Sequence, residues 1–349
     1  MDFPSAEELA SWIGLSDPDD VRALHARAYA VKSDAVGRRV SIRGLIEAGN
    51  VCAKDCRYCG IRKSNSKVER YGLSQEEIVS CARFAAEAGY GSVVIQSGEI
   101  EGEAHARFIE DVLHAIAPLK LGVTLSLGEQ TEDVYRRWRA AGATRYLLRI
   151  ETSNPALYAA LHPADCSFGR RVECLRALRR CGYQVGTGVM AGLPGQTPDD
   201  LARDIEFFRD IDADMIGMGP YIPHPDTPLA AEAADWSAER SLRLGLNMIA
   251  ATRLALRDVN IAAATALQAL DPLGREKGLL AGANVVMPNV TDVKYRAQYK
   301  LYADKPCLDE NAALCRGCLQ RRIESIGETV LWNVPGDSAH FFARTRPGM

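Results

Sequence analysis

Long hydrophobic runs are missing from this sequence, and no apolar stretch approaches the length that crosses a membrane. Lysines and arginines do not gather into a basic patch, and the formal net charge is only −3. These absences argue against membrane insertion and against binding to nucleic acid or to an anionic membrane. The first residues, MDFPSAEELASW, are acidic and amphipathic rather than signal-like, so we expect a cytoplasmic protein.

Cysteine, in contrast, is abundant, with ten residues in a chain of 349. In a reducing compartment they are not expected to form a disulfide framework. Three lie close together at positions 52, 56 and 59, and three more gather at positions 307, 315 and 318. Isolated cysteines are commonly small buried hydrophobic residues, so we assign no role to the other four. These are Cys81, Cys166, Cys174 and Cys181.

A helix–turn–strand unit recurs five times along the chain, as in AAEAGYGSVVIQSG and LLAGANVVMP. A glycine or aspartate turn ends each helical stretch, and a short apolar run follows. Such runs are typical of parallel strands that are covered on their outer face. We expect strands near residues 40–48, 92–97, 121–127, 144–150, 184–190, 215–219, 260–264 and 284–287.

Eight strands alternating with helices over roughly 250 residues predict an α/β fold, a (β/α)8 barrel of the TIM type. A doubly wound open sheet is the alternative, because alternation alone does not distinguish the two. We expect the barrel to span residues 38–300. A helical lead would precede it at residues 1–37, and a short C-terminal extension with the second cysteine group would follow at 301–349.

The first cysteine group, Cys52, Cys56 and Cys59, has the spacing C-x3-C-x2-C and directly follows the first expected strand. In a barrel this position is the C-terminal rim, where catalytic groups collect. Three thiolates are one short of the four that hold an ordinary 4Fe-4S cluster, which leaves one iron open to a small molecule. A zinc site is the other interpretation, but zinc normally recruits a fourth His or Cys, and the nearest histidine, His25, is remote in sequence.

This motif, with Tyr58 as the aromatic residue before the third cysteine, resembles the signature of the radical S-adenosylmethionine superfamily. The resemblance implies that S-adenosylmethionine chelates the open iron through its amino and carboxylate groups. One electron from the cluster would then break a carbon–sulfur bond and yield a 5′-deoxyadenosyl radical. By the same resemblance Cys52, Cys56 and Cys59 are the catalytic ligands, and Tyr58 contacts the cofactor.

The end of the second expected strand carries a polar turn formed by Ser97, Gly98 and Glu99. Alone, such a turn would be uninformative. After this cysteine loop it resembles the superfamily's Gly-Gly-Glu segment, whose backbone and carboxylate hold the methionine amino group. A glycine suits a place where the backbone approaches a ligand closely.

Polar residues also end the third and fourth strands. Alternation places Thr124 and Ser126 on one face of the third strand, and Arg149 and Glu151 on one face of the fourth. Opposite charges in a barrel mouth are costly unless they bind a ligand or each other, so a structural ion pair is the alternative here. Arg171, early in the next helix, could neutralise the cofactor carboxylate, although a lone helix arginine is usually a solvated surface group.

Four segments are closely similar to the HydE family of iron–iron hydrogenase maturases: RYLLRIETSNP, AGLPGQTPDDL, MIGMGPYIPHPDTPLA and GANVVMPN. The resemblance extends from about residue 40 to Cys318, and methylornithine synthase and biotin synthase are further relatives. It implies cofactor contacts at Ser126, Glu151 and Arg171, with Glu151 at the ribose. The residues that we assign to a substrate cavity are Arg43, Gln96, Thr124, Arg149, Thr265, Tyr299 and Tyr302.

The family resemblance also implies a role in assembling the two-iron subcluster of the iron–iron hydrogenase active site, the H-cluster. The substrate would be a small organometallic species of the Fe(CO)2(CN)-cysteine type, and other hydrogenase maturases would be transient partners. The tail group, Cys307, Cys315 and Cys318, resembles a second site that many HydE proteins have, for a 2Fe-2S cluster or zinc. An unoccupied remnant is the alternative.

Two positions depart from the family pattern. Ile150 stands where a histidine is expected, and Ala264-Thr265 stands where two threonines are expected. Ile150 should point outward by alternation, whereas Ala264 removes a possible substrate anchor.

Three other functions are alternatives. The first is a carbon-skeleton mutase of the methylornithine synthase type that acts on lysine. The tail cysteines and the pair Tyr299 and Tyr302 favour the HydE interpretation over it. A sulfur-inserting enzyme of the biotin synthase type is disfavoured, because no cysteines end strands 2 to 6. A carrier that merely delivers metal would leave the charged strand ends unexplained.

Overall fold

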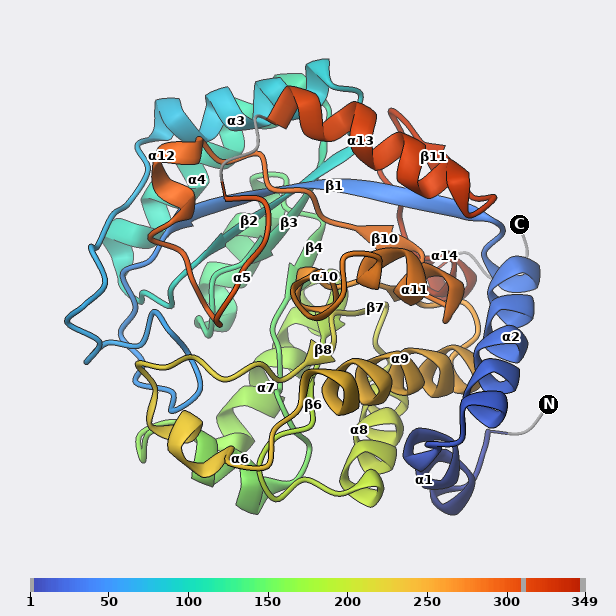
Figure 1. Cartoon of the computed structure of the whole chain (residues 1–349). Helices are drawn as coiled ribbons and strands as arrows, with labels where there is room; N and C mark the ends of the chain where they lie inside the picture. Colours follow the sequence, from blue (N-terminus) through green and yellow to red (C-terminus); the bar gives the residue numbers. More distant parts are fainter. Residues whose placement is uncertain (1–2, 309–311, 346–349) are drawn as a thin grey trace.

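The computed structural model covers residues 3–308 and 312–345, with the backbone alone at 312–315. Eight parallel strands lie side by side in a ring that helices cover on the outside (Figure 1). The strands follow one another around the ring in chain order. They are β1 (Arg39–Gly49), β2 (Ser92–Ser97), β3 (Gly122–Ser126), β4 (Arg145–Leu147), β5 (Gln184–Thr187), β7 (Met215–Ile216), β9 (Asn260–Ile261) and β10 (Val285–Val286).

The ring closes between its last two strands. β10 pairs with β1, and just past β9 a parallel bridge joins Ala262 to Val285. Backbone hydrogen bonds of 2.9 Å run from Ala263 N to the Val285 carbonyl and from Asn284 N to the Ile261 carbonyl. Closure confirms the predicted (β/α)8 barrel and excludes the open doubly wound sheet.

All eight strands lie where the sequence predicts them, although most are shorter. β5 and β7 end near two glycines, Gly188 and Gly217, after which β6 (Met190–Ala191) and β8 (Gly219–Pro220) pair with each other. A Cβ added at Gly188 would lie 2.0 Å from the Gly217 carbonyl oxygen. The two backbones can therefore approach this closely only because one of them has no side chain there.

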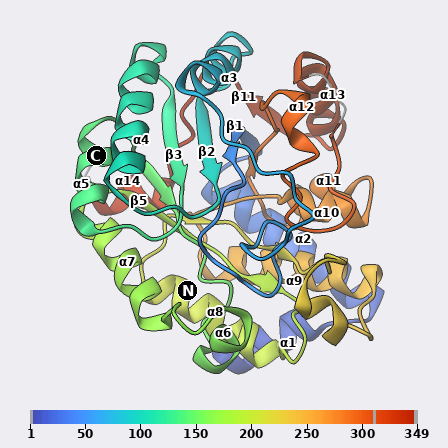
Figure 2. The same ribbon diagram turned by 90° about the vertical axis from the view of Figure 1, so that its left-hand side faces the viewer.

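Several helices of the outer layer bury an apolar face toward the barrel. In α4 (Glu103–Ile116) the buried residues Ile109, Val112 and Ile116 recur at intervals of three and four. Figure 2 shows α3 and α4 alongside the parallel strands β1, β2 and β3. In the described part of the chain no helix combines the length and apolar character of a membrane span. The remaining helices from the barrel onward are α3 (Gln75–Glu87), α5 (Glu132–Ala140), α6 (Pro155–Leu161), α7 (Phe168–Arg180), α8 (Pro198–Asp210), α9 (Ala238–Ala255), α10 (Thr265–Leu270), α11 (Gly274–Leu280), α12 (Val293–Arg296), α13 (Ala312–Ser325) and α14 (Ala339–Thr345).

Polar residues line the inside of the barrel, where branched aliphatic layers usually fill such folds. Arg43 of β1, Thr124 of β3 and Arg145 of β4 are buried, and Arg43 reaches Met215 of β7. Gly122 leaves room for one of these long side chains, since a Cβ added there would lie 2.7 Å from the Arg145 guanidinium. The interior therefore resembles a polar cavity wall more than an apolar core.

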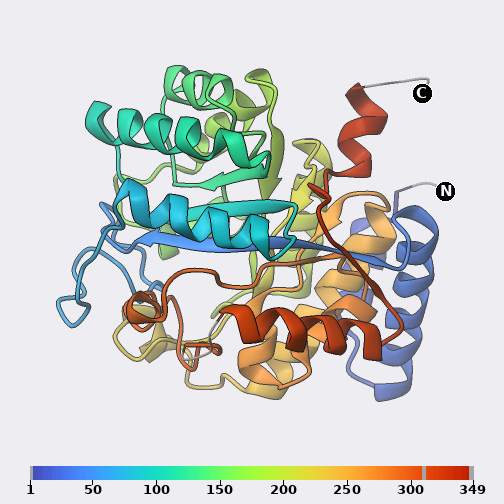
Figure 3. The ribbon, with the colours of Figure 1, turned by 90° about the horizontal axis from the view of Figure 1, so that it is seen from above.

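The C-terminal extension closes the end of the barrel opposite the carboxyl ends of the strands. β11 (Thr329–Leu331) pairs with the first residues of β1, and the chain then crosses beneath the strands (Figure 3). The Gly336 carbonyl accepts a 3.0 Å hydrogen bond from Arg43, and Asp337 forms an ion pair with Arg145. Two buried arginines thus find their partners in the chain's own C-terminal segment.

The N-terminal helices α1 (Ala6–Gly14) and α2 (Pro18–Ala35) pack on α8 and α9 at the side of the barrel (Figure 1). Leu9 of α1 belongs to the main hydrophobic cluster. Lys32 of α2 forms a fully buried 3.0 Å ion pair with Glu328 of the extension. Lead, barrel and extension thus share one core, and the exact boundaries given above stay predictions.

The end of the barrel that the C-terminal extension closes, which we call the floor, leads to a stability prediction. Asp337→Ala should lower the free energy of unfolding by about 2 kcal/mol, because it leaves the Arg145 charge buried without its partner. This value is below that for fully buried pairs, since the Asp337 side chain is 27% exposed. Urea denaturation would measure the change. Asp210→Ala, which breaks the exposed pair with Arg209, is the control and should cost less than about 0.5 kcal/mol. Equal losses of stability in the two variants would contradict the role of Asp337 as the partner of the buried Arg145.

The docking of α14 should depend on pH. His340 lies 3.1 Å from Asp258 and 2.7 Å from Asp212, and the hydrogen bond to Asp258 raises its pKa to about 9. Because the pKa is raised from 6.5, the stabilisation is complete below pH 6.5 and disappears as the pH rises through 9. The melting temperatures of the wild type and His340→Gln should therefore differ at pH 6 and converge by pH 10. A constant difference would show that the imidazolium is not the cause.

Candidate active site

The cysteine loop begins at the carboxyl end of β1 and is held against the end of β2. Ala53 N donates to the Glu99 carbonyl at 2.8 Å, which joins the loop to the rim of β2. Cys52 Sγ accepts two backbone N–H groups at 3.4 Å each, one from Lys54 and one from Glu99. Cys52 is thereby positioned by its own loop and by the neighbouring strand, at the rim where the sequence predicts the site.

Two glycines make this close packing possible. A Cβ added at Gly98 would lie 2.2 Å from the Val51 carbonyl oxygen and 2.8 Å from the Cβ of Cys52. Gly128 has φ of +77°, and a Cβ there would lie 2.1 Å from the Cγ of Glu99. Gly98 therefore lets the backbone of β2 touch the cysteine loop, and Gly128 leaves the space that Glu99 occupies.

The three thiols suit an iron–sulfur cluster. Burial raises the pKa of Cys59 to about 12 and that of Cys56 well above its ordinary value, and neighbouring thiols act in the same direction. A bound iron would offset this cost of ionisation, because the positive charge of the metal favours the deprotonated thiolate. Within the described residues, no three side chains of His, Cys, Asp or Glu form a finished site for a single metal ion. Three thiols on one loop are one fewer than the four that hold an ordinary 4Fe-4S cluster.

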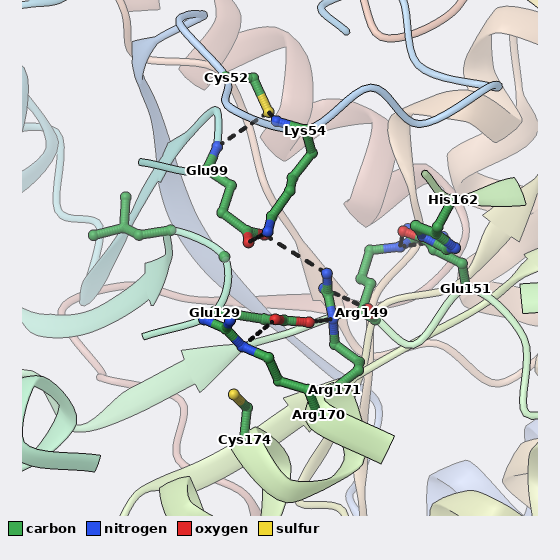
Figure 4. A network of polar contacts seen from close by, with 12 residues as sticks. Cys52, Lys54, Glu99, Glu129, Arg149, Glu151, His162, Arg170, Arg171 and Cys174 are labelled. Carbon is green, nitrogen blue, oxygen red and sulfur yellow. Dashed lines mark hydrogen bonds and ion pairs between the residues drawn. The ribbon is translucent and has the colours of Figure 1, made fainter. Parts of the chain in front are cut away.

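Charges of alternating sign lie behind the cysteine loop (Figure 4). Lys54 Nζ is 3.3 Å from Glu99 Oε1, and Arg171 Nη2 is 3.6 Å from Glu99 Oε2. Arg171 Nε donates to Glu129 Oε1 at 2.7 Å, and Arg170 Nε lies 2.9 Å from Glu129 Oε2. The sequence analysis gave no role to Lys54, Glu129 or Arg170. Each is close in sequence to a residue that it did assign, but only the fold brings them together.

The electrostatics of this network suit a zwitterion. Burial raises the pKa of Glu99, while Arg171 and Lys54 act against the rise. Burial would lower the pKa of Arg171, but Glu99 and Glu129 help to hold it well above its ordinary value. Lys54 contacts Glu99 Oε1 as an ion pair, without hydrogen-bond geometry. A ligand with both an ammonium and a carboxylate group could bind Glu99 through one and Arg171 through the other.

The end of β4 places a second acid at the rim. Arg149 donates to Glu151 from Nε at 3.0 Å and from Nη2 at 2.9 Å, so the two residues form the ion pair that was the alternative. Both lie past β4, which ends at Leu147, so strand alternation does not place their side chains. Glu151 has φ of 66° and is fixed by a 3.0 Å bond from its N to the Gly188 carbonyl. Ile150 is buried in the main hydrophobic cluster and so points outward. Ser126 ends β3 in register with Gln96.

Several predicted cavity residues meet on the other side of the rim. Gln96 Nε2 donates to the Tyr299 hydroxyl at 3.2 Å. Thr265, the first residue of α10, accepts a 3.1 Å hydrogen bond from Arg275, a residue to which the sequence analysis gave no role. Arg275 also lies near Tyr302, whose pKa burial raises. The first contact joins residues that are 203 positions apart, and the second joins residues that are ten positions apart.

Two further predicted cavity residues lie deeper in the barrel. Arg43 is in register with Ser92, the first residue of β2, and binds Gly336 at the floor rather than the rim. Thr124 is fully buried, and its hydroxyl has no partner among the described residues. Their roles toward a substrate stay predictions.

The tail cysteines lie apart from the cysteine loop. Cys307 and Cys318 line one cavity together with Arg275 and Arg322. The third predicted ligand, Cys315, falls outside the described side chains. Two members of the group therefore share a cavity, and the identity of what they bind stays a prediction.

Substituting Gly98 should disable the cluster loop. The Cβ of Gly98→Ala would push the rim of β2 away from Val51 and Cys52, so we expect at least a tenfold loss in bound iron per chain after anaerobic reconstitution. Gly72→Ala is the matched control, because a Cβ at Gly72 has nothing within 4 Å. Iron and sulfide analysis would measure both. Normal iron content in Gly98→Ala would show that the close contact is not needed.

The chain is similar to several known proteins. The sequence pattern of the Radical SAM superfamily matches residues 46–208. The FeFe hydrogenase maturase subunit HydE of Thermotoga maritima is 44% identical over 321 residues, covering 92% of this chain and 90% of that protein. The 3-methylornithine synthase of Methanosarcina acetivorans is 27% identical and covers 81% of this chain and 78% of its own length. The crystal structure of methylornithine synthase (PylB) has a TM-score of 0.79 at 23% identity, covers 94% of each chain and shows the same fold.

The similarity to HydE extends over nine tenths of both chains. Its extent and degree place this chain in the HydE family of radical S-adenosylmethionine enzymes.

Proposed function

We propose that this enzyme acts in the assembly of the iron–iron hydrogenase active site, on a small organometallic substrate of the Fe(CO)2(CN)-cysteine type. The observation that carries the proposal is the 44% identity to a hydrogenase maturase over 92% of the chain. The polar barrel interior supports it, because a charged, hydrogen-bonding metal complex needs polar walls rather than an apolar core.

Cys52, Cys56 and Cys59 would hold a 4Fe-4S cluster, with S-adenosylmethionine bound beside it. When bound, this pair supplies one-electron cleavage of a carbon–sulfur bond and a 5′-deoxyadenosyl radical. Glu99 would accept the methionine ammonium and Arg171 would donate to its carboxylate, in the places where they now face each other at 3.6 Å. Glu151 would accept hydrogen bonds from the ribose. The other residues proposed to line the cofactor are Tyr58, Ser97, Gly98 and Ser126.

The substrate would lie below the cofactor, among the side chains that meet inside the rim. Gln96 with Tyr299, and Thr265 with Arg275, offer hydrogen-bond donors and acceptors in pairs. Arg149, Tyr302, Thr124 and Arg43 would complete the wall. The C-terminal segment beneath Arg43 and Arg145 would keep water from entering by the floor, which protects a reactive species.

The finer assignments belong to the same proposal. Cys307, Cys315 and Cys318 would hold a second cluster of the 2Fe-2S type, supported by the cavity that Cys307 and Cys318 share. We further propose a cytoplasmic enzyme that meets other hydrogenase maturases transiently, without nucleic acid or membrane as partner.

The proposal predicts which compound stimulates turnover. Reconstituted, reduced enzyme should form 5′-deoxyadenosine faster with a synthetic iron–cysteine complex bearing carbonyl and cyanide ligands than with no addition. Cys52→Ala, Cys56→Ala and Cys59→Ala should each reduce the product at least a hundredfold, because each removes a cluster ligand. Anaerobic chromatography with mass spectrometry would measure the product. Cys81→Ala, on an outer helix, is the control and should behave as wild type.

The other outcomes are equally informative. Stimulation by lysine instead would move the assignment to a mutase of the methylornithine synthase type, the relative at 27% identity. A protein that binds a cluster but forms no 5′-deoxyadenosine under any condition would fit a metal carrier.

A further inference from the structure

The cysteine loop is docked on the C-terminal end of a short helix, α6. Arg57, between the first two thiols and the third, donates from its backbone N to the Leu161 carbonyl at 2.9 Å. Its side chain also donates to the Ala160 carbonyl at 3.2 Å. The next residue of the loop makes a third contact with the next residue after the helix. The Tyr58 hydroxyl lies 3.3 Å from His162 Nε2. Three consecutive residues of α6 and its cap therefore hold two consecutive residues of the loop.

The direction of the Tyr58–His162 hydrogen bond is fixed by chemistry. His162 Nδ1 lies 2.9 Å from the Tyr158 carbonyl oxygen, which can only accept, so Nδ1 carries a proton. His162 is 5% exposed, and burial lowers its pKa, which favours the neutral ring. Nε2 of a neutral ring protonated at Nδ1 has a free lone pair, so the Tyr58 hydroxyl must be the donor.

The ring of His162 has little freedom to turn. It stacks on Tyr158 with centroids 4.0 Å apart and meets Tyr58 edge-on at 5.6 Å. The acceptor nitrogen Nε2 therefore has a fixed direction. At position 58, a tyrosine can donate a hydrogen bond to it, whereas a phenylalanine cannot.

The other end of α6 is anchored just after Glu151. Ser153 N donates to Asp204 Oδ1 of α8 at 2.6 Å, and the Asn154 side chain donates to Asp200 at 2.9 Å. Asn154 also caps the helix by accepting from two backbone N–H groups of its first turn. The helix thus links the strand end that carries Glu151 to the cysteine loop, and His162 lies on the Glu151 side of the charge network in Figure 4.

We propose that His162 is a positioning residue for the cofactor site and acts through the hydroxyl of Tyr58. Tyr58 lies between Cys56 and Cys59, so an anchored hydroxyl holds this half of the loop, and with it two of the three thiols, at a set distance from Glu151. The proposal rests on the assignment of this loop to the cluster and S-adenosylmethionine. It adds a residue outside the cysteine motif whose effect passes through a single hydrogen bond.

A histidine that merely fills the core would behave differently from one that acts through this bond. Loss of packing would lower stability and would not depend on the Tyr58 hydroxyl. Loss of positioning would weaken S-adenosylmethionine binding to the same extent whether the donor or the acceptor is removed, and removing both would add nothing.

The test is a double-mutant cycle with Tyr58→Phe, His162→Phe and the double variant, each reconstituted with its cluster. We expect each of the three proteins to bind S-adenosylmethionine about fivefold more weakly than wild type, the effect of one neutral hydrogen bond, with iron content retained. The change in the electron paramagnetic resonance spectrum of the reduced cluster on addition of S-adenosylmethionine should be altered alike in all three. His162→Gln, which keeps an acceptor oxygen, should recover part of the affinity.

His105→Phe is the matched control, because His105 contacts Trp138 on the outside of the barrel. It should bind S-adenosylmethionine as wild type does. Wild-type affinity in Tyr58→Phe, or losses that add in the double variant, would overturn the proposal even where His162→Phe is too unstable to study. If the wild type itself fails to bind S-adenosylmethionine, the proposed cofactor site fails instead, and the two failures are thereby distinguished.

Discussion

The ion pair between Arg171 and Glu129 fixes the arrangement of the rim. The Glu129 side chain is 1% exposed and that of Arg171 is 10% exposed, so neither charge has water as an alternative partner. Removing one partner of such a pair typically costs about 3–5 kcal/mol, because the other charge stays buried. From this anchor Arg171 reaches Glu99 of the β2 rim and donates to the Arg149 carbonyl at 3.1 Å. One side chain from α7 thereby ties together the ends of three strands.

The same constraint acts at the opposite end of the barrel in a different way. Arg43 and Arg145 point into an interior that contains few other partners, and each lowers the free energy of its burial by contacts with residues 335–337. Buried arginines therefore have partners at both ends of the barrel. At the rim the partners are acids that follow neighbouring strands, and at the floor they belong to the C-terminal segment. A polar interior of this kind lacks the packing energy of a barrel filled with apolar side chains. In return, it leaves space and hydrogen-bonding groups for a polar ligand.

The sequence predicted the barrel and the cysteine rim well because both depend on local patterns. Alternating helices and strands and the C-x3-C-x2-C spacing are readable without knowing what lies nearby in space. The charge network was only half predicted. Glu99, Glu151 and Arg171 came from a family resemblance, whereas Lys54, Glu129 and Arg170 were missed. Their importance depends on pairings between segments that are up to about seventy residues apart, as for Arg170 and Glu101. No periodicity or motif encodes such pairings.

The floor was missed for a related reason. Pro335, Gly336 and Asp337 look like an ordinary turn in sequence, and their role appears only when β11 pairs with β1 and directs the chain under the strands. Arg43 was assigned to the substrate cavity on resemblance alone, and its contacts at the floor show that a single residue can belong to the interior wall and to its closure at once. Strand ends could be predicted only approximately, since the breaks after β5 and β7 depend on the mutual approach of Gly188 and Gly217.

The two departures from the family pattern, at positions 150 and 264, lie in different surroundings. Ile150 faces outward into the hydrophobic cluster, so exchanging a histidine there leaves the rim charges untouched. Ala264 is the N-cap of α10 and makes no side-chain cap, while the neighbouring Thr265 hydroxyl is already engaged by Arg275. A threonine at position 264 would have offered a second hydroxyl at this end of the cavity. The departure at position 150 therefore lies in the hydrophobic cluster, whereas the departure at position 264 lies beside Thr265 and Arg275, which we propose to line the substrate cavity.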